Sequence, residues 1–188
     1  VSPQTDINLQ PALESASSKN IPVVNVNDAV MPDARYYVGN VQKDNGVRVA
    51  KWFIQHHPQG GKVAVIEGQP GVYAAGQRTR GFKETLDSAG KFTIVASVPA
   101  NWSREQAFNA ASTILQQHPD LIGIYANNDT MALGVVEAVR AQNKASQVAI
   151  FGTDGISDAY ASIKRGELTG TVDSFPVLTG EVAMDVMI

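Results

Sequence analysis

The chain has 188 residues, of which 44% are hydrophobic and 18% are charged, and its formal net charge is −3. This composition is close to that of an average soluble globular protein and excludes collagen-like, low-complexity and disordered chains. The absence of Cys excludes disulfides, thiol nucleophiles and Cys-ligated metals, and the 15 Lys and Arg residues form no basic run that would bind nucleic acid.

Short apolar runs rich in β-branched residues alternate with longer helical patterns along the chain. In order, we predict a helix over residues 9–18, strands over 23–26 and 36–38, a helix over 47–57, a strand over 63–66, a helix over 74–88, a strand over 92–95, a helix over 103–118, a strand over 121–125, a helix over 131–142, a strand over 148–151 and a helix over 157–165. Apolar runs without alternation are typical of strands buried on both faces. We therefore expect an α/β fold built from βαβ units around a parallel sheet.

We expect this sequence to be a piece of a longer polypeptide. It begins at Val1 rather than at Met, and it stops at Ile188 within a helical pattern. No apolar stretch approaches the roughly 18 residues of a membrane span, and no leader pattern opens the chain. Within the chain, we predict a lobe boundary near residues 38–41, where a strand ends in Gly39 and Asn40.

Polar side chains follow most of the predicted strands. The residues beyond the strand ends include Asn27, Asp28, Glu67, Gln69, Arg78, Asn101, Trp102, Asn127, Asn128, Asp129, Asp154, Asp173 and Ser174. Ligands of open parallel sheets bind beyond the carboxyl ends of the strands. Amide, carboxylate, guanidinium and indole groups together suit an uncharged ligand that carries many hydroxyl groups. Alternatively, Asn and Asp residues here cap the following helices, and we favour this capping role for Asp129.

Motifs for catalysis and for cofactors are incomplete. The glycines after the strand at 63–66 have neither dinucleotide-binding nor phosphate-loop spacing, the His residues lack metal-ligand spacing, and no Ser lies in a nucleophile elbow. Asp129 and Asp154 could form a carboxylate pair for glycoside hydrolysis. We do not favour that alternative, because two acids at strand ends equally suit sugar binding. We expect no enzyme activity, no cofactor and no metal.

Four segments resemble the ribose/allose-type periplasmic sugar-binding proteins, which are solute receptors of ABC transporters with the type I periplasmic binding protein fold. These segments are Ile21-Pro22-Val23-Val24, Ala126-Asn127-Asn128-Asp129-Thr130-Met131-Ala132-Leu133-Gly134, Gly152-Thr153-Asp154-Gly155 and Gly166-Glu167-Leu168-Thr169-Gly170-Thr171-Val172. The resemblance implies two hinged α/β lobes that clamp a monosaccharide or polyol. It divides the chain into the end of a first lobe (residues 1–40), a second lobe (41–172) and a return segment to the first lobe (173–188).

The resemblance also assigns ligand contacts to seven residues: Asn27, Asp28, Arg78, Trp102, Asn128, Asp154 and Ser174. Asp28 departs from the ribose pattern, where an Arg is usual, and Ser174 stands where many members have Gln. Trp102 would stack on the apolar face of the sugar ring. The alternative for Trp102 is a hydrophobic staple that packs on Ala107 ahead of the helix cap at Ser103.

The resemblance implies a periplasmic receptor, expected as a monomer, whose partners are the sugar and the membrane permease of an ABC transporter. An alternative from another class is the effector-binding domain of a LacI-type transcription regulator, which shares this fold and would carry a helix-turn-helix upstream. A sugar-processing enzyme is the third reading, and no residue pair demands it.

Overall fold

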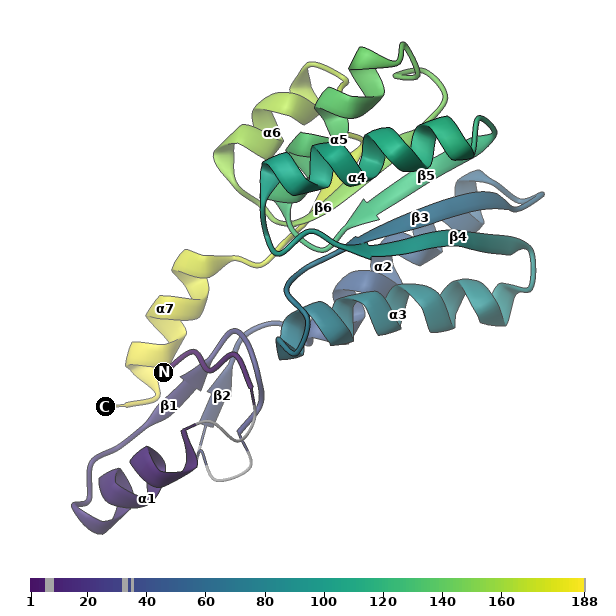
Figure 1. Cartoon of the computed structure of the whole chain (residues 1–188). Helices are drawn as coiled ribbons and strands as arrows, with labels where there is room; N and C mark the ends of the chain where they lie inside the picture. Colours follow the sequence, from purple (N-terminus) through teal and green to yellow (C-terminus); the bar gives the residue numbers. More distant parts are fainter. Residues whose placement is uncertain (6–8, 32–33, 35, 188) are drawn as a thin grey trace.

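The computed structural model describes residues 1–5, 9–31, 34 and 36–187, and it has the predicted α/β architecture with parallel strands throughout. Two sheets lie in separate parts of the molecule (Figure 1). The smaller part contains the two-stranded sheet β1 (Val24–Val26) and β2 (Tyr36–Val38), together with α1 (Gln10–Ser18) and α7 (Pro176–Asp185).

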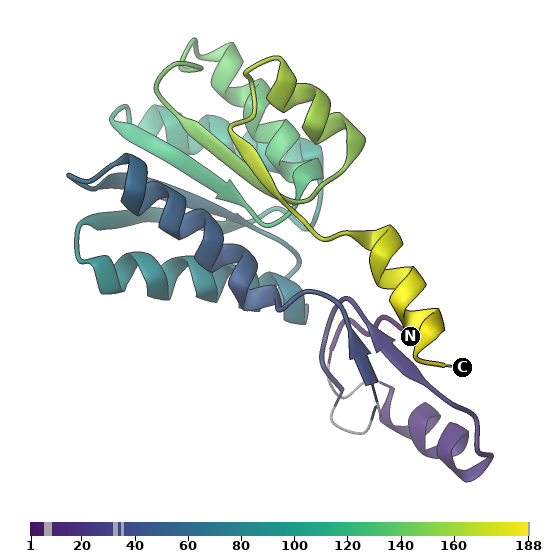
Figure 2. The same ribbon diagram turned by 180° about the vertical axis from the view of Figure 1, so that it is seen from behind.

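The larger part is a five-stranded sheet in the order β4 (Phe92–Pro99), β3 (Gly61–Glu67), β5 (Leu121–Ala126), β6 (Ala149–Asp154) and β7 (Gly170–Asp173). Helices α2 (Gln42–His56) and α3 (Tyr73–Ala89) cover one face. Helices α4 (Arg104–Gln117), α5 (Asp129–Ala141) and α6 (Ser157–Lys164) cover the other, as both views show (Figures 1 and 2).

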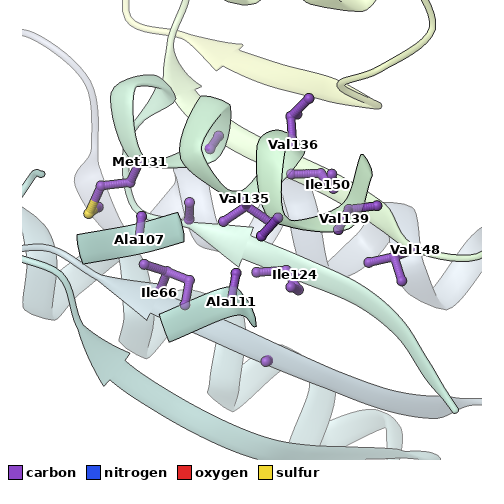
Figure 3. Close-up of a cluster of buried hydrophobic side chains, with 14 of the residues drawn as sticks. Ile66, Ala107, Ala111, Ile124, Met131, Val135, Val136, Val139, Val148 and Ile150 are labelled. Atoms are coloured by element: carbon purple, nitrogen blue, oxygen red, sulfur yellow. The ribbon is translucent and has the colours of Figure 1, made fainter. Parts of the chain in front are cut away.

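Each face of this sheet has its own hydrophobic core. Phe53, Phe82 and Tyr125 lie in the core under α2 and α3, and none of them is exposed. The opposite core joins the sheet to α4 and α5, and Figure 3 shows Ile66 and Ile124 among its members. Because β3 contributes alternate residues to both cores, its segment 63–66 is buried throughout, as the unalternating apolar run predicts.

Two helix starts differ from the prediction by more than one residue. We predicted α2 from residue 47, but it begins at Gln42, because Gln42 and Asn45 are buried polar residues that no apolar pattern reveals. We predicted α5 from residue 131, but it begins at Asp129. No helix in the part of the chain that the structure describes is long and apolar enough to cross a membrane.

The chain passes between the two parts at residues 39–41 and again at residues 174–175 (Figure 1). The resemblance to periplasmic sugar-binding proteins also implies strand-like crossings between the lobes over residues 38–41 and 172–176. That expectation is wrong in extent, because β2 ends at Val38, β7 ends at Asp173 and α7 already begins at Pro176. The extended pairing stops where each sheet ends, since the crossing residues have no neighbouring strand to bond with.

Glycines allow α2 and α3 to pack in close contact. A Cβ added at Gly46 would collide with the carbonyl oxygen of Arg78 on α3, and one added at Gly81 would collide with the carbonyl oxygen of Lys43 on α2. The two helices therefore touch backbone to backbone. Gly76 lies on the same helix as Gly81, but a Cβ there would meet nothing within 4 Å.

These two glycines predict opposite effects of the same substitution. We expect Gly81→Ala to lower the free energy of unfolding by about 1–3 kcal/mol, because the new methyl group forces the helices apart. We expect Gly76→Ala to raise it by about 0.5–1 kcal/mol, because Ala is the better helix former and the space is open. Urea denaturation of both variants measures the difference, and equal effects would contradict backbone contact at Gly81.

Candidate functional site

The candidate site lies beyond the carboxyl ends of the five-stranded sheet, beside the point where the strand order reverses between β3 and β5. Gly68 follows β3 and Asn127 follows β5, and the Gly68 N–H donates to the Asn127 Oδ1 at 3.0 Å. Asp154 closes the neighbouring strand β6. The strand ends thus meet at one edge, as the sequence predicts.

Arg78 is the centre of this edge. Its side chain is only 6% exposed. Its Nε donates to the Gln42 Oε1 at 2.9 Å, and its Nη1 donates to the Asn127 carbonyl oxygen at 2.7 Å and to the Asp154 Oδ1 at 3.4 Å. The Nη2 makes no hydrogen bond to any described residue. One donor edge of a buried guanidinium is therefore left for a ligand.

Asp154 combines a carboxylate with an unusual backbone conformation. Its φ is 129°, in a region that favours glycine, and its side chain is 33% exposed. Burial raises the pKa of Asp154 to about 6, against the lowering effect of the Arg78 charge, and Asp129 adds a further raising effect. Ser174 stabilises this position, because its Oγ donates to the Asp154 carbonyl oxygen at 3.0 Å. Three of the predicted site residues are thus in direct contact.

Asn128, and not Asp129, caps helix α5. The Asn128 Oδ1 accepts from the Met131 N–H at 3.0 Å. The capping role that we predicted for Asp129 is wrong, because its Oδ2 instead accepts from the N–H groups of Gly155 and Ile156 at 2.8 and 3.0 Å. Asp129 thereby shapes the loop that follows Asp154. The Asn128 Nδ2 makes no hydrogen bond to a described residue and is available for a ligand.

Asn127 is a site residue whose role was not predicted. Its side chain is fully buried, and its Oδ1 accepts from Gly68 N–H and from the Thr79 Oγ1 at 3.1 Å. Its Nδ2 is buried without a partner among the described residues. The only feature of the sequence that points to Asn127 is that it stands next to a second amide, Asn128. That pairing does not reveal which of the two side chains faces inward.

Asn27 and Asp28 come from the smaller part of the molecule. Asn27 has a φ of 65° and an exposed side chain, and its carbonyl oxygen accepts from the Gln42 Nε2 and from the Tyr37 hydroxyl. The Asp28 Oδ1 accepts from the Ala74 N–H at 3.3 Å, at the start of α3. Burial raises the pKa of Asp28, while the Ala74 N–H and the Arg78 charge oppose the rise. One Asp28 oxygen is therefore used within the protein.

Helix α3 has no side-chain cap of its own. Its N-cap residue is Val72, whose side chain accepts no hydrogen bond. The first two N–H groups of the helix are instead satisfied from the start of the chain and from the segment after β1. The Tyr73 N–H donates to the Gln4 carbonyl oxygen at 2.9 Å, and the Ala74 N–H donates to Asp28.

Trp102 lies at the margin of the site, half-buried. It has a φ of 63°, and a Cβ added at Gly68 would overlap its indole ring. The ring also packs against a cluster of small apolar residues at the start of α3, which includes Val72 and Ala75. Trp102 therefore contributes to packing across the β3–α3 loop, which is more than the staple on Ala107 that we considered. The predicted helix cap is confirmed, because the Ser103 Oγ accepts from the Gln106 N–H.

Of two hollows formed by described residues, one lies apart from this group of residues and the other adjoins it at Gly68. One, of about 560 Å³, lies between α1, β1 and the chain end after α7, and includes Leu13, Val24 and Met187. The other, of about 270 Å³, is formed by residues 67–77 of the β3–α3 loop and the start of α3. Among the described residues, no group of three or more His, Cys, Asp and Glu side chains is arranged to hold a metal ion.

Comparison with known proteins gives a family match along the entire sequence. A family model described as "Periplasmic binding protein domain" matches residues 1–188. The D-allose-binding periplasmic protein of Escherichia coli K12 is 34% identical over 195 residues, which covers 99% of this chain and 63% of that protein. The ribose import binding protein of Bacillus subtilis 168 is 32% identical, with coverages of 98% and 60%. The chain thus spans less than two thirds of these relatives.

Solved structures agree with the sequence matches. An ABC transporter solute-binding protein from Actinobacillus succinogenes 130z, solved with bound D-allose, has a TM-score of 0.89 and 34% identity, covering 100% of this chain and 68% of its own. The Caulobacter myo-inositol binding protein, solved with myo-inositol, has a TM-score of 0.88 and 32% identity, with coverages of 98% and 64%.

The raised pKa of Asp154 predicts a pH dependence of stability. Between its ordinary value of 3.8 and about 6, the folded state holds the proton that the unfolded state has lost. The Asp154 contribution to the free energy of unfolding is therefore full below about pH 4, falls as the pH rises to about 6 and then levels off. We expect Asp154→Asn to lack this fall, so that its stability relative to wild type rises over the same window.

Asp120→Asn is the matched control for this measurement. The pKa of Asp120 is lowered by its hydrogen bond with Lys62, so its contribution is lost only as the pH falls below its ordinary range. We expect the Asp120→Asn difference to be flat between about pH 5 and 7. Urea denaturation at several pH values measures both variants, and a flat Asp154→Asn difference would contradict the raised pKa.

Proposed function

The chain belongs to the family of periplasmic binding protein domains, and we propose that it is part of a receptor that captures a monosaccharide or related polyol between two hinged lobes. In this proposal the receptor delivers the sugar to the membrane permease of an ABC transporter, and no bond is made or broken. The contact between Arg78 and Asp154 carries the proposal. It places a buried donor and a partly exposed acceptor side by side at the strand ends.

The chemistry of the site favours a neutral, hydroxyl-rich ligand. The Arg78 Nη2 and the Asn128 Nδ2 are donors without a described partner, and the carboxylates of Asp154 and Asp28 supply acceptors. Donors and acceptors of this kind bind the adjacent hydroxyl groups of a sugar, each of which both donates and accepts. A strongly anionic ligand is disfavoured, because the carboxylates of Asp154 and Asp28 both lie near the Arg78 cation.

We extend the proposal to the division of the chain. Residues 1–40 and 173–188 belong to the first lobe, and residues 41–172 form the second. The separate sheets support this division, because β1 and β2 form one and β3 to β7 form the other, with crossings at 39–41 and 174–175. A boundary at residue 40 or 41 also agrees with the start of α2 at Gln42.

The receptor reading is favoured over the LacI-type regulator by the relatives. Those named above are a D-allose-binding periplasmic protein and a ribose import binding protein, and they match at 32–34% identity. The name of the D-allose-binding periplasmic protein also supports a periplasmic location. The relatives are solute-binding proteins rather than enzymes, which supports a binding role for this chain as well.

Sugar binding is tested with D-allose, D-ribose and myo-inositol, which are the ligands named for the relatives. A sugar at 100 times its dissociation constant should raise the free energy of unfolding by about 2.7 kcal/mol, measured by thermal shift. We expect Asp154→Ala to weaken the binding of the active sugar by about 10- to 100-fold in calorimetry, because hydrogen bonds to a charged group are lost.

The outcome of this test also depends on pH. Because sugar hydroxyl groups donate to the ionised form of Asp154, the affinity should fall as the pH drops below about 6. If Asp154→Ala binds the sugar with wild-type affinity, Asp154 is not a ligand-binding residue. Failure of every sugar and polyol to stabilise the protein would overturn the receptor function itself.

The stacking role of Trp102 predicts a fluorescence response. In a Trp52→Phe background, sugar should change the emission of the remaining Trp102, because the exposed face of its ring meets the ligand. In a Trp102→Phe background, Trp52 should not respond. Trp52 is a partly buried residue of α2 that packs against the core under α2 and α3, and its ring stacks on His56 with centroids 4.1 Å apart.

Trp102→Ala separates packing from stacking. The packing of the indole over Gly68 predicts a loss of about 1–2 kcal/mol in unfolding free energy, and stacking predicts weaker sugar binding in addition. If Trp102→Ala lowers the unfolding free energy but leaves the sugar affinity unchanged, and if sugar does not change the Trp102 emission in the Trp52→Phe background, then Trp102 has only a packing role.

A further inference from the structure

Gln42 contacts residues of both parts of the molecule. It is the first residue of α2, directly after the crossing at residues 39–41, and it is only 3% exposed. Its Nε2 donates to the carbonyl oxygen of Asn27 in the smaller part. Its Oε1 accepts from the Arg78 Nε at 2.9 Å in the larger part. Both ends of one buried carboxamide are therefore occupied, each by the backbone or side chain of a predicted ligand-binding residue.

The surroundings of Gln42 restrict its orientation. The Asn45 Nδ2, one helical turn further along α2, donates to the same Gln42 Oε1 at 3.4 Å. Gly46 lies on the same side of α2, and its lack of a side chain lets the backbone of Arg78 approach. The close contact between α2 and α3 thus brings the Gln42 amide within hydrogen-bond distance of the guanidinium.

The bond from Gln42 determines which donors of Arg78 remain for a ligand. Because the guanidinium is planar, bonds at Nε and Nη1 fix the plane and direction of all five N–H groups. Without the acceptor on Gln42, the Nε–H is buried and unpaired, and the guanidinium is free to turn toward other acceptors. The direction of the Nη2 group then changes.

The other end of the amide is fixed beside the crossing. The Asn27 carbonyl oxygen that accepts from Gln42 also accepts from the Tyr37 hydroxyl at 3.1 Å. The Asn27 N–H pairs with the carbonyl oxygen of Val38, and a Cβ on Gly39 would stand 2.8 Å from the Asn27 backbone. Asn27 is therefore held tightly where the chain leaves the smaller part.

We propose that Gln42 is a positioning residue of the binding site, which orients the Arg78 guanidinium toward the ligand while anchored on the Asn27 carbonyl beside the crossing. This inference deepens the proposed sugar-binding function, on which its affinity measurements rest. Gln42 need not touch the ligand. Its effect is to hold a ligand-binding donor in one direction, and to make that direction depend on how the two parts of the chain are arranged.

Two substitutions separate the two bonds of Gln42. Gln42→Met has nearly the same shape and removes both bonds. Gln42→Glu keeps an acceptor for the Arg78 Nε–H but removes the donor to Asn27. Gln116→Met is the matched control, because Gln116 is exposed on α4. Should Gln42→Met fail to fold in thermal unfolding, Gln42→Asn replaces it, since its amide is one methylene too short to reach both partners.

The first measurement needs no sugar. In the full native protein, nuclear magnetic resonance follows the exchange of the Arg78 Nε–H with water. We expect slow exchange in wild type, Gln42→Glu and Gln116→Met, and much faster exchange in Gln42→Met. Slow exchange in a folded Gln42→Met would overturn the positioning role, even if no sugar had been found.

The second measurement is sugar affinity by calorimetry. We expect Gln42→Met to bind the active sugar about tenfold or more weakly, Gln42→Glu to lie between it and wild type, and Gln116→Met to match wild type. Wild-type affinity in Gln42→Met would overturn the proposal. Wild-type affinity in Gln42→Glu would overturn the anchoring on Asn27. If Gln42→Glu and Gln42→Met lose affinity equally while the Arg78 Nε–H of Gln42→Glu still exchanges slowly, the orientation of Arg78 is not the cause of the loss. If wild type binds no sugar, the proposed function fails, and the exchange measurement still decides the position of Arg78.

Discussion

A guanidinium buried beyond the ends of a parallel sheet is the constraint on which the rest of this structure depends. The Arg78 guanidinium carries five N–H donors and no acceptor, so its buried N–H groups need partners. The partners come from α2, from the end of β5 and from the end of β6, which are far apart in the sequence. These elements must therefore be placed relative to one another within the tolerance of a hydrogen bond.

The scaffold meets this requirement through close packing and a fixed strand register. Gly46 and Gly81 let α2 and α3 touch backbone to backbone, and this contact sets the distance from Gln42 to Arg78. On the sheet, Tyr125 of β5 pairs with Phe151 of β6, so the ends of the two strands lie at a fixed offset. Side chains on helices and strands that are packed on both faces have little freedom to move, which suits a site made of directional hydrogen bonds.

Much of the fold could be predicted from the sequence, because the cores depend on apolar periodicity. The unalternating run in β3 indicates a strand buried on both faces, and the rule that ligand groups gather at strand ends places Asp154 at the same edge as Asn127. The direct contact between Arg78 of α3 and Asp154 is seen only in the structure. Periodicity fails for polar residues that are buried by tertiary contacts. Gln42 begins a helix whose first turn looks solvent-exposed, and only its partners on two other elements explain its burial.

The roles of neighbouring amides and acids depend on directions that a sequence does not contain. Asn127 turns inward to Gly68, while Asn128 caps the following helix and Asp129 accepts from a loop beyond the next strand. All three residue types are suited to capping and to ligand binding, so composition cannot separate them. Their assignment is decided by which backbone N–H groups each side chain reaches, and those groups are brought there by the packing of other elements.

The start of α3 has an energetic consequence for any movement between the two parts of the chain. Its first N–H groups, at the positive end of the helix dipole, are satisfied by the Gln4 carbonyl and by the Asp28 carboxylate. If these segments moved away, water would have to replace both acceptors, and a cap of this kind is worth about 0.5–2 kcal/mol. These two hydrogen bonds thus contribute to the stability of the docked arrangement whether or not a ligand is bound. A ligand that binds this arrangement gains affinity, because less of its binding energy is needed to shift the conformational equilibrium.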